Sequence, residues 1–122
     1  MNESIKNEFE RSSCPVANAL DLFGDKWTLL IVRDLILGKI RYGEFAKSPE
    51  AIPTNILAER LKRLEQAGIV AKTPYCDKPP RYQYELTDKG KDLQPVLEAM
   101  VAWAMNYVPG VMVSPRYREK QE

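Results

Sequence analysis

The sequence predicts a mainly helical α+β fold that contains one two-stranded β-hairpin. Three patterns predict this class. Leucines recur at a helical spacing over residues 54–67, and two stretches of strand character flank a proline-rich loop over residues 69–87. Near the two ends of the chain, residues 15–23 and 88–107 have the apolar pattern of packed helices.

The length and composition limit the kind of protein that this chain can be. Its 122 residues fit one domain, so we expect residues 1–122 to form a single domain with a flexible tail over 109–122. There is no pattern of a signal peptide or a membrane-spanning helix, and two cysteines do not make a disulfide scaffold. We therefore expect a cytoplasmic protein without a membrane partner.

Histidine is absent from the chain, which removes the commonest general base and the commonest zinc ligand. Two cysteines cannot fill a tetrahedral zinc site unaided. We therefore expect no enzyme activity, no metal site and no cofactor. A thiol enzyme is the remaining catalytic alternative, and no cleft motif supports it.

Charge is distributed unevenly although the net charge of the chain is only +1. Residues 39–91 carry 11 basic and 7 acidic groups, whereas residues 1–38 have a net charge of −2 and residues 92–122 a net charge of −1. Positive charge therefore gathers around the helix expected at 54–67, which favours an anionic partner there.

The first two helices follow from proline and from apolar periodicity. Cys14-Pro15 is expected to open a helix, because proline suits the first helical position. Its apolar stripe consists of Val16, Leu20 and Phe23. A second helix, from about Lys26 to Gly38, is apolar nearly all round, which predicts a central place in the core.

Residues 42–67 have the order of a helix-turn-helix motif, with a brief helix at 42–46, a turn, and a longer amphipathic helix at 54–67. Thr54 is placed to cap the longer helix, and Gly68 stands where a left-handed C-terminal cap is usual. The apolar stripe consists of Leu57, Leu61 and Leu64, and the opposite face of Asn55, Ala58, Glu59, Lys62, Arg63 and Gln66. Such a face suits a DNA major groove, although a merely solvated amphipathic helix has the same pattern.

The segment 69–87 is expected to form the β-hairpin. Tyr82, Tyr84 and Leu86 alternate with polar residues, so one face should pack while the other meets water. The loop from Cys76 to Arg81 would be the hairpin tip, called the wing. The combined pattern predicts a winged helix-turn-helix.

Thr87 is expected to cap the last helix, over about 88–107, and Pro95 to bend it near residues 91–92. The apolar residues of this helix cover more than one stripe, which exceeds what one small domain can bury. We therefore expect a homodimer in which this helix and the 15–23 helix form a symmetric interface.

The residues expected to contact double-stranded operator DNA lie on the 54–67 helix and on the wing. The set assigned to base edges is Asn55, Ala58, Glu59 and Lys62. An amide pairs with adenine, a carboxylate accepts from cytosine, and a methyl group touches thymine. The set assigned to phosphates is Thr54, Arg60 and Arg63, joined by Lys78 and Arg81, which would straddle a phosphate or enter a narrow minor groove. Plain surface exposure is the alternative for each residue, and an internal carboxylate is the alternative partner of Arg60.

Several motifs occur in a characteristic order. They are Cys14-Pro-Val16, Gly24-Asp-Lys-Trp27-Thr-Leu-Leu30, Arg41-Tyr-Gly-Glu-Phe45, the stretch from Leu57 to Gly68, and Tyr84-Glu-Leu86-Thr-Asp-Lys-Gly90. Over about residues 12–107 the chain resembles the HxlR-type winged helix-turn-helix regulators, which are relatives of the MarR group. It departs from them at Tyr42-Gly43 and in its tail. The resemblance implies a dimeric transcription factor that binds operator DNA, which we expect to be a repressor.

The resemblance also implies that the Cys14 position can act as a redox-sensing thiol, because some members of the family react there with quinones, aldehydes or oxidants. A thiol at a helix N-terminus feels the positive end of the helix dipole, which favours the thiolate. Cys76 is a candidate partner thiol across the dimer. The alternative for Cys14 is a small, inert apolar residue.

The candidate signals are therefore a small electrophile or an aromatic effector. A pocket between the last helix and Trp27, lined by Phe23, Met100 and Trp103, could hold an aromatic molecule, although core packing is the simpler use of those residues. The competing function is a winged-helix module for protein–protein contact without DNA binding. Such modules commonly lack a basic face, whereas the middle of this chain is cationic.

Overall fold

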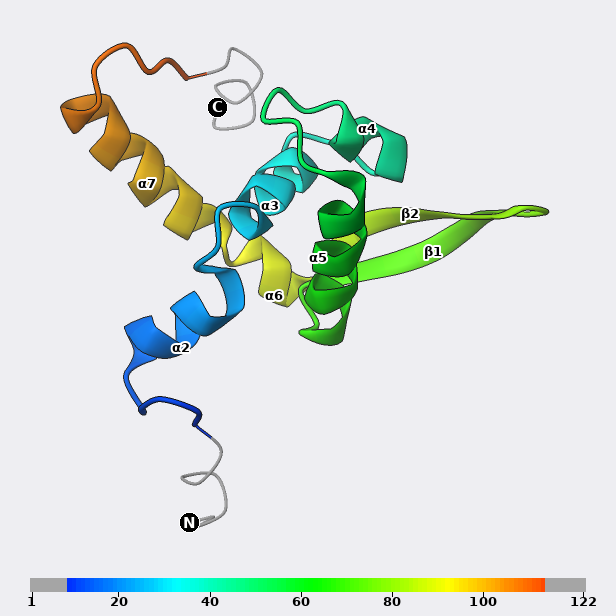
Figure 1. Cartoon of the computed structure of the whole chain (residues 1–122), viewed down its shortest axis with the longest axis horizontal. Coiled ribbons are helices and arrows are strands. Elements are labelled where there is room, and N and C mark those ends of the chain that lie inside the picture. The colour runs from blue at the N-terminus through cyan, green and yellow to red at the C-terminus, as the bar shows by residue number, and fades with distance from the viewer. Residues whose placement is uncertain (1–8, 114–122) are drawn as a thin grey trace.

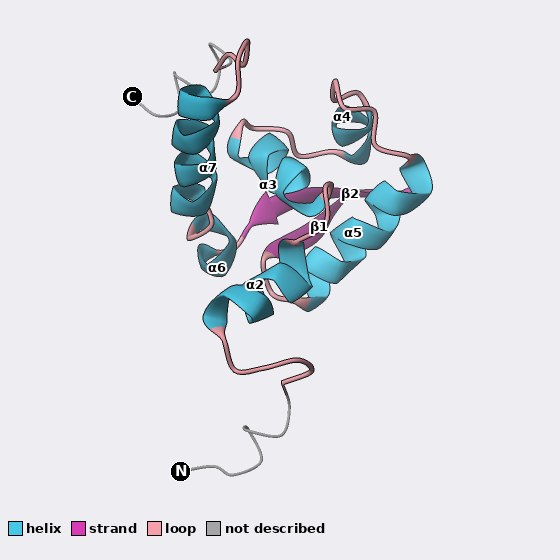
Figure 2. Cartoon of the chain, turned by 60° about the vertical axis from the view of Figure 1, so that its left-hand side comes forward, coloured by secondary structure: helices cyan, strands magenta, loops and turns pink. Residues whose placement is uncertain are grey.

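The computed structural model describes residues 9–113. The helices are α2 (Pro15–Phe23), α3 (Thr28–Ile36), α4 (Tyr42–Ala46), α5 (Thr54–Gln66), α6 (Asp88–Lys91) and α7 (Gln94–Tyr107), and the strands are β1 (Val70–Asp77) and β2 (Pro80–Leu86). The predicted class and element order are confirmed. Helices α3, α4 and α5 gather at the root of the hairpin, and α2 and α7 lie on the side away from its tip (Figures 1 and 2). The tail was predicted over residues 109–122, and the part of it that follows residue 113 lies outside the described residues.

Helix α3 is central, as predicted, and Ile31 and Val32 on it are almost completely buried. It begins at Thr28, later than expected, because the Asp25 carboxylate accepts hydrogen bonds from the backbone N–H groups of Trp27 and Thr28, at 3.0 and 3.1 Å. The cap therefore comes from the loop between α2 and α3.

The helix-turn-helix consists of α3's neighbours α4 and α5. Phe45 on α4 points inward and is 1% exposed, and the three predicted leucines of α5 are buried. The expected capping role of Thr54 is wrong. Pro53 holds the cap position with an extended backbone, and its carbonyl accepts the first helical hydrogen bond, from Leu57 at 2.9 Å. Gly68 adopts the predicted left-handed conformation, with φ of 77°.

The wing is a long antiparallel hairpin in which Val70 pairs with Leu86 and Asp77 with Pro80. The expected loop over residues 76–81 is wrong, because the strands continue to a two-residue turn at 78–79. The predicted alternation holds at the root of the hairpin only. Tyr84 packs edge-on against Phe45, with ring centroids 6.2 Å apart, whereas Tyr82, which is nearer the tip, is exposed.

The expected final helix is two helices, α6 and α7, separated by Asp92 and Leu93. Thr87 caps α6 as predicted, since its hydroxyl accepts from the Gly90 N–H at 3.2 Å. The bend predicted near residues 91–92 is a full break. Pro95 lies in the first turn of α7, where its missing N–H costs no helical hydrogen bond.

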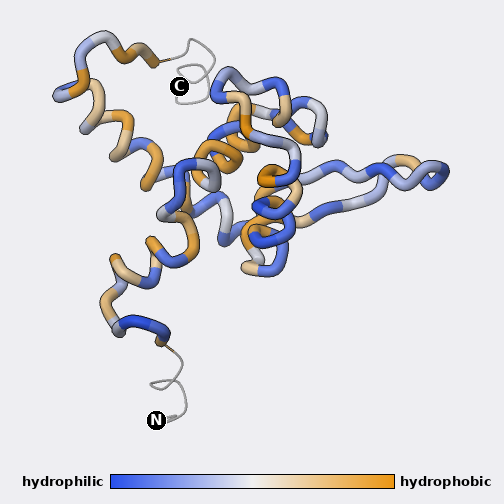
Figure 3. Tube along the Cα trace, viewed as in Figure 1, coloured by the Kyte–Doolittle hydropathy of each residue, from blue (hydrophilic) through white to orange (hydrophobic). Residues whose placement is uncertain are grey.

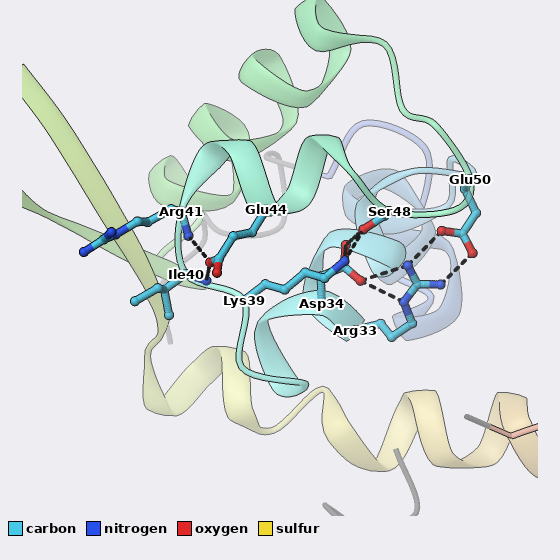
Figure 4. A network of polar contacts seen from close by, with 8 residues as sticks. All are labelled: Arg33, Asp34, Lys39, Ile40, Arg41, Glu44, Ser48 and Glu50. Atoms are coloured by element: carbon cyan, nitrogen blue, oxygen red, sulfur yellow. Dashed lines mark hydrogen bonds and ion pairs between the residues drawn. The ribbon is translucent and has the colours of Figure 1, made fainter. Parts of the chain in front are cut away.

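A polar cluster fixes the turn that leads into α5 (Figure 4). Asp34 on α3 is 3% exposed and accepts a short hydrogen bond from the Ser48 hydroxyl, which in turn accepts from Lys39 Nζ at 2.7 Å. Arg33 donates two hydrogen bonds of 2.8 Å to Glu50, and these bonds lower the pKa of the Glu50 carboxyl. The turn between α4 and α5 is therefore held by charge-assisted bonds to α3.

Candidate nucleic-acid interface

The outward face of α5 is open, as the sequence predicts. The exposed residues on it are Thr54, Asn55, Ala58, Glu59, Lys62 and Gln66. Lys62 takes part in no ion pair with any residue of 9–113, so its charge is available to a partner. The buried leucines hold this face outward, because they anchor the opposite side of the helix in the core.

Arg60 is bound internally, which is the alternative that its position on the flank suggests. Its Nε lies 3.0 Å from Asp25 Oδ2, it also contacts Glu59, and its side chain is 18% exposed. Partial burial opposes ionisation of Asp25, but hydrogen bonds from Thr28 and Arg60 outweigh it and lower the pKa of Asp25 from 3.8 to about 2. Arg60 thus ties α5 to the start of α3.

Glu59 and Arg63 form a second, more exposed pair on the same helix. Arg63 Nη2 lies 3.3 Å from Glu59 Oε2, and its Nη1 lies 4.0 Å from Asp25. The hydrogen bond from Arg60, followed by the charge of Arg63, lowers the pKa of the Glu59 carboxyl. Glu59 remains half exposed, and a carboxylate has lone pairs for a further donor.

The wing carries the other two predicted cations. Lys78 forms half of the tip, and Arg81 stands on β2 opposite Cys76. Both side chains are exposed, and neither is ion-paired within the described part of the chain. The wing therefore carries two exposed cations, with Asp77 as the acidic neighbour of Lys78, and its tip points away from the helices (Figure 1).

Sequence reasoning missed Arg41 and Tyr75. Arg41 directly precedes α4, and its guanidinium lies over the Tyr75 ring of β1, 4.0 Å from the ring centroid. The available signal was a cation immediately before the first helix of a helix-turn-helix. The Tyr75 contact had no local signal, because it depends on how the hairpin pairs with the segment that precedes α4.

The two cysteines lie far apart within one chain. Cys14 is exposed and precedes α2, and its carbonyl accepts hydrogen bonds from the backbone and side-chain amides of Asn18, at 3.0 and 2.8 Å. Cys76 is half-buried close to the hairpin tip, with its Sγ 3.8 Å from the Lys78 carbonyl oxygen. The start of α2 and the hairpin tip lie at opposite ends of the molecule (Figure 1).

The residues predicted to line an effector pocket near Trp27 are mostly wrong. An apolar groove of about 380 Å³ does lie between α3 and α7, but its walls include Leu30, Leu37, Met100 and Val111, and neither Phe23 nor Trp103 lines it. Trp103 is 62% exposed, so the alternative prediction that it packs in the core is also wrong.

Residues 9–113 bring no three cysteine, aspartate or glutamate side chains together as a metal-ligand set. Each of their helices is too short or too polar to traverse a lipid bilayer.

Comparisons with known proteins show that the chain is similar to transcriptional regulators. The family model described as HxlR-like helix-turn-helix matches residues 22–112. The HTH-type transcriptional regulator YdeP of Bacillus subtilis is 37% identical over 101 residues, which are 83% of this chain and 77% of that protein. An HTH-type transcriptional regulator of Mycobacterium tuberculosis is 36% identical over 105 residues, 86% of this chain, and the chain spans 65% of the length of that relative.

Two solved structures extend the comparison. The reduced form of the transcriptional regulator YodB from B. subtilis is 37% identical, has a TM-score of 0.66, and is similar over 81% of this chain and 98% of its own. The redox regulator HypR in its reduced form is 34% identical, has a TM-score of 0.70, and is similar over 76% of this chain and 92% of its own.

Proposed function

The chain belongs to the HxlR-like helix-turn-helix family, and on that basis we propose that it is a sequence-specific DNA-binding transcriptional regulator that acts as a homodimeric repressor. The observation that carries the proposal is the polar face of α5, which is held outward beside an exposed cationic wing. A recognition helix in the major groove with a wing at the adjacent backbone or minor groove uses both surfaces at once.

The roles of the α5 residues follow from their exposure and pairing. Asn55 and Ala58 stand on the first outward turns, where an amide reads adenine and a methyl group touches thymine. Lys62 is unpaired within residues 9–113 and reaches a base or a phosphate. Glu59 retains an accepting position for cytosine, and Thr54 and the partly exposed Arg63 serve phosphates. Arg60 orients the helix through Asp25.

A homodimer is supported by apolar residues that the described chain leaves uncovered. Val16 and Leu20 on α2 are 66% and 51% exposed, and Trp103 and Tyr107 on α7 are 62% and 69% exposed. Figure 3 shows hydrophobic residues along both helices, which project from the same side of the body. A symmetric interface built from α2 and α7 would cover these residues, and the dimer would present two α5 faces, one from each subunit.

Regulation through Cys14 is the second part of the proposal. Its thiol is exposed and stands at the start of α2, beside the proposed interface. The similar structures include a diamide-treated YodB and an oxidised form of the redox regulator HypR. Oxidation or alkylation of Cys14 would change the interface and with it the spacing of the two α5 helices.

The direct test is fluorescence anisotropy with the DNA upstream of the protein's own gene and with a scrambled duplex of equal length. We expect tighter binding to the upstream duplex, and for both duplexes a loss of affinity of about a thousandfold or more between roughly 50 and 200 mM salt if six or more phosphates are contacted. Equal, weak binding to both duplexes at low salt would exclude sequence-specific regulation, and would favour a protein–protein module.

A further inference from the structure

We propose that the trough between α4 and the wing is a binding site for one DNA strand's sugar-phosphate backbone, held by Arg41 and Arg81. This inference rests on the proposed function and deepens it, because it assigns a contact that lies outside the α5 face. The trough has a volume of about 400 Å³, and its walls include Arg41, Tyr42, Tyr75, Arg81, Tyr82 and Tyr84. Cations are thus combined with an aromatic floor in one open depression.

The charge of Arg41 is available to a ligand. Arg33 and Arg60 are both neutralised by carboxylates within 3.0 Å, whereas neither Arg41 nor Arg81 has a carboxylate within 4.0 Å among residues 9–113. Arg41 instead stacks on Tyr75 at 4.0 Å. A stacked guanidinium keeps its N–H edge open, and this edge matches two phosphate oxygens.

The backbone of Arg41 is fixed before any ligand arrives. Its N–H donates to Glu44 Oε1 at 2.9 Å, and the residue forms an isolated β-bridge with Gln83 of the wing. The neighbouring Ile40 carbonyl accepts from the Tyr84 N–H at 2.7 Å. In Figure 4 the Arg41 side chain extends from the start of α4 towards the strands. The wall formed by α4 and the wall formed by the wing are therefore joined at this residue.

The position of the trough suits the backbone between two grooves of a duplex. At one end, the Tyr42 hydroxyl donates to the Thr54 carbonyl oxygen at 2.6 Å, so the trough starts where α5 starts. At the other end, Arg81 stands next to Pro80 at the tip of the wing. If α5 lies in a major groove and the wing reaches the next minor groove, the phosphates that separate these grooves pass between the two.

The test compares Arg41→Ala and Arg81→Ala with Lys91→Ala, which removes the same charge from an exposed residue at the end of α6. Each trough variant is expected to lose about tenfold in affinity for upstream and scrambled DNA alike, and to reduce the salt slope by about 0.9 for each phosphate contact removed. Lys91→Ala should leave both the affinity and the slope close to wild type.

Stacking is tested separately from charge. Arg41→Lys keeps the charge but loses the planar fork, so we expect several-fold weaker binding with a nearly unchanged salt slope. Tyr75→Leu should weaken binding as Arg41→Lys does, whereas Tyr75→Phe keeps the ring and should bind like wild type. Circular dichroism and thermal unfolding of each variant establish that it is folded.

Two results overturn the inference. If folded Arg41→Ala binds DNA with wild-type affinity and slope while Asn55→Ala loses operator preference, the trough is not a backbone site although the protein is a regulator. If the trough variants lose affinity for the operator only, Arg41 acts on base readout and not on the backbone. Failure of the wild-type chain to bind any duplex would instead remove the proposed function itself.

Discussion

The Nε atom of Arg60 on α5 lies 3.0 Å from Oδ2 of Asp25, in the loop between α2 and α3. The same carboxylate caps α3 by accepting from the backbone of Trp27 and Thr28. One side chain in the loop that follows α2 therefore joins the central helix α3 to α5, the proposed recognition helix. The orientation of α5 depends on this carboxylate as well as on its buried leucines.

Asp25→Asn should destabilise the fold near neutral pH, by on the order of 1–2 kcal/mol once solvent screening of the ion pair is allowed for. The pKa of Asp25 is lowered to about 2 in the folded chain. Its contribution is therefore complete above its unfolded value of 3.8 and is lost as the pH falls through about 2. Urea unfolding at pH 7 and near pH 3 should show a smaller acid loss in Asp25→Asn. The exposed Asp92→Asn serves as control, and an identical acid loss in wild type and Asp25→Asn would contradict the assignment.

Gly90→Ala should cost about 2–3 kcal/mol of unfolding free energy, because overpacking forces backbone to move. A Cβ at this buried glycine would lie 2.3 Å from the Ile69 carbonyl oxygen and 2.8 Å from Leu86 Cδ2. Gly43→Ala on α4 is the matched control, since a Cβ there meets nothing within 4 Å. Denaturant unfolding measures both, and equal stability of the two variants would show that the close packing of α6 on the hairpin is not retained in solution.

Asn55→Ala should weaken binding to the upstream DNA by about 1–3 kcal/mol and relax preference at one base pair, because it removes a bidentate contact to a base edge. Lys78→Ala should instead weaken all duplexes alike and flatten the salt dependence. Anisotropy titrations against a set of single base-pair substitutions distinguish the two. Equal losses by Asn55→Ala on operator and scrambled DNA would remove Asn55 from base readout.

Leu20→Glu on α2 and Trp103→Glu on α7 should each convert the protein to a monomer, because a buried charge in an apolar interface is left unpaired. Both residues are more than half exposed in the single chain, so the monomer should keep its helical circular dichroism. Sedimentation velocity measures the mass. A monomeric wild type would refute the proposed interface, and so would variants that remain dimeric.

Cys14→Ser should retain DNA binding after treatment with diamide, whereas the wild-type protein should lose it, because only the wild type has the exposed thiol at the start of α2. Cys76→Ser separates an interchain disulfide from other oxidation products, since it should prevent a dimer on non-reducing gels. Unchanged DNA binding by oxidised wild type would leave Cys14 without a sensing role.

Much of the fold could be predicted because its signals are local. The leucine spacing predicted α5, Pro15 predicted the start of α2, and Gly68 predicted the left-handed residue that follows α5. The errors arose where a distant residue decides the outcome. Asp25 delays the start of α3, and strand pairing shortens the wing tip to two residues.

In the candidate interface, too, the features with local signals were predicted and those that depend on distant residues were not. The open face of α5 follows from periodicity alone, whereas the binding of Arg60 by Asp25 joins residues 35 positions apart. The contact of Arg41 with Tyr75 likewise depends on tertiary folding. A sequence pattern shows which cations exist, but three-dimensional pairing decides which of them remain available.

The interruption at Asp92 and Leu93 leaves α7 as a separate rod on a two-residue joint. Because Leu93 in that joint packs against the core and Leu97 on α7 is buried in it, a substitution at Leu93 would re-aim the rod by changing how α7 packs on the body, while the outward face of α5 stays in place. In the proposed dimer, such a change would alter the distance between the two α5 faces, and therefore the operator spacing that the dimer fits.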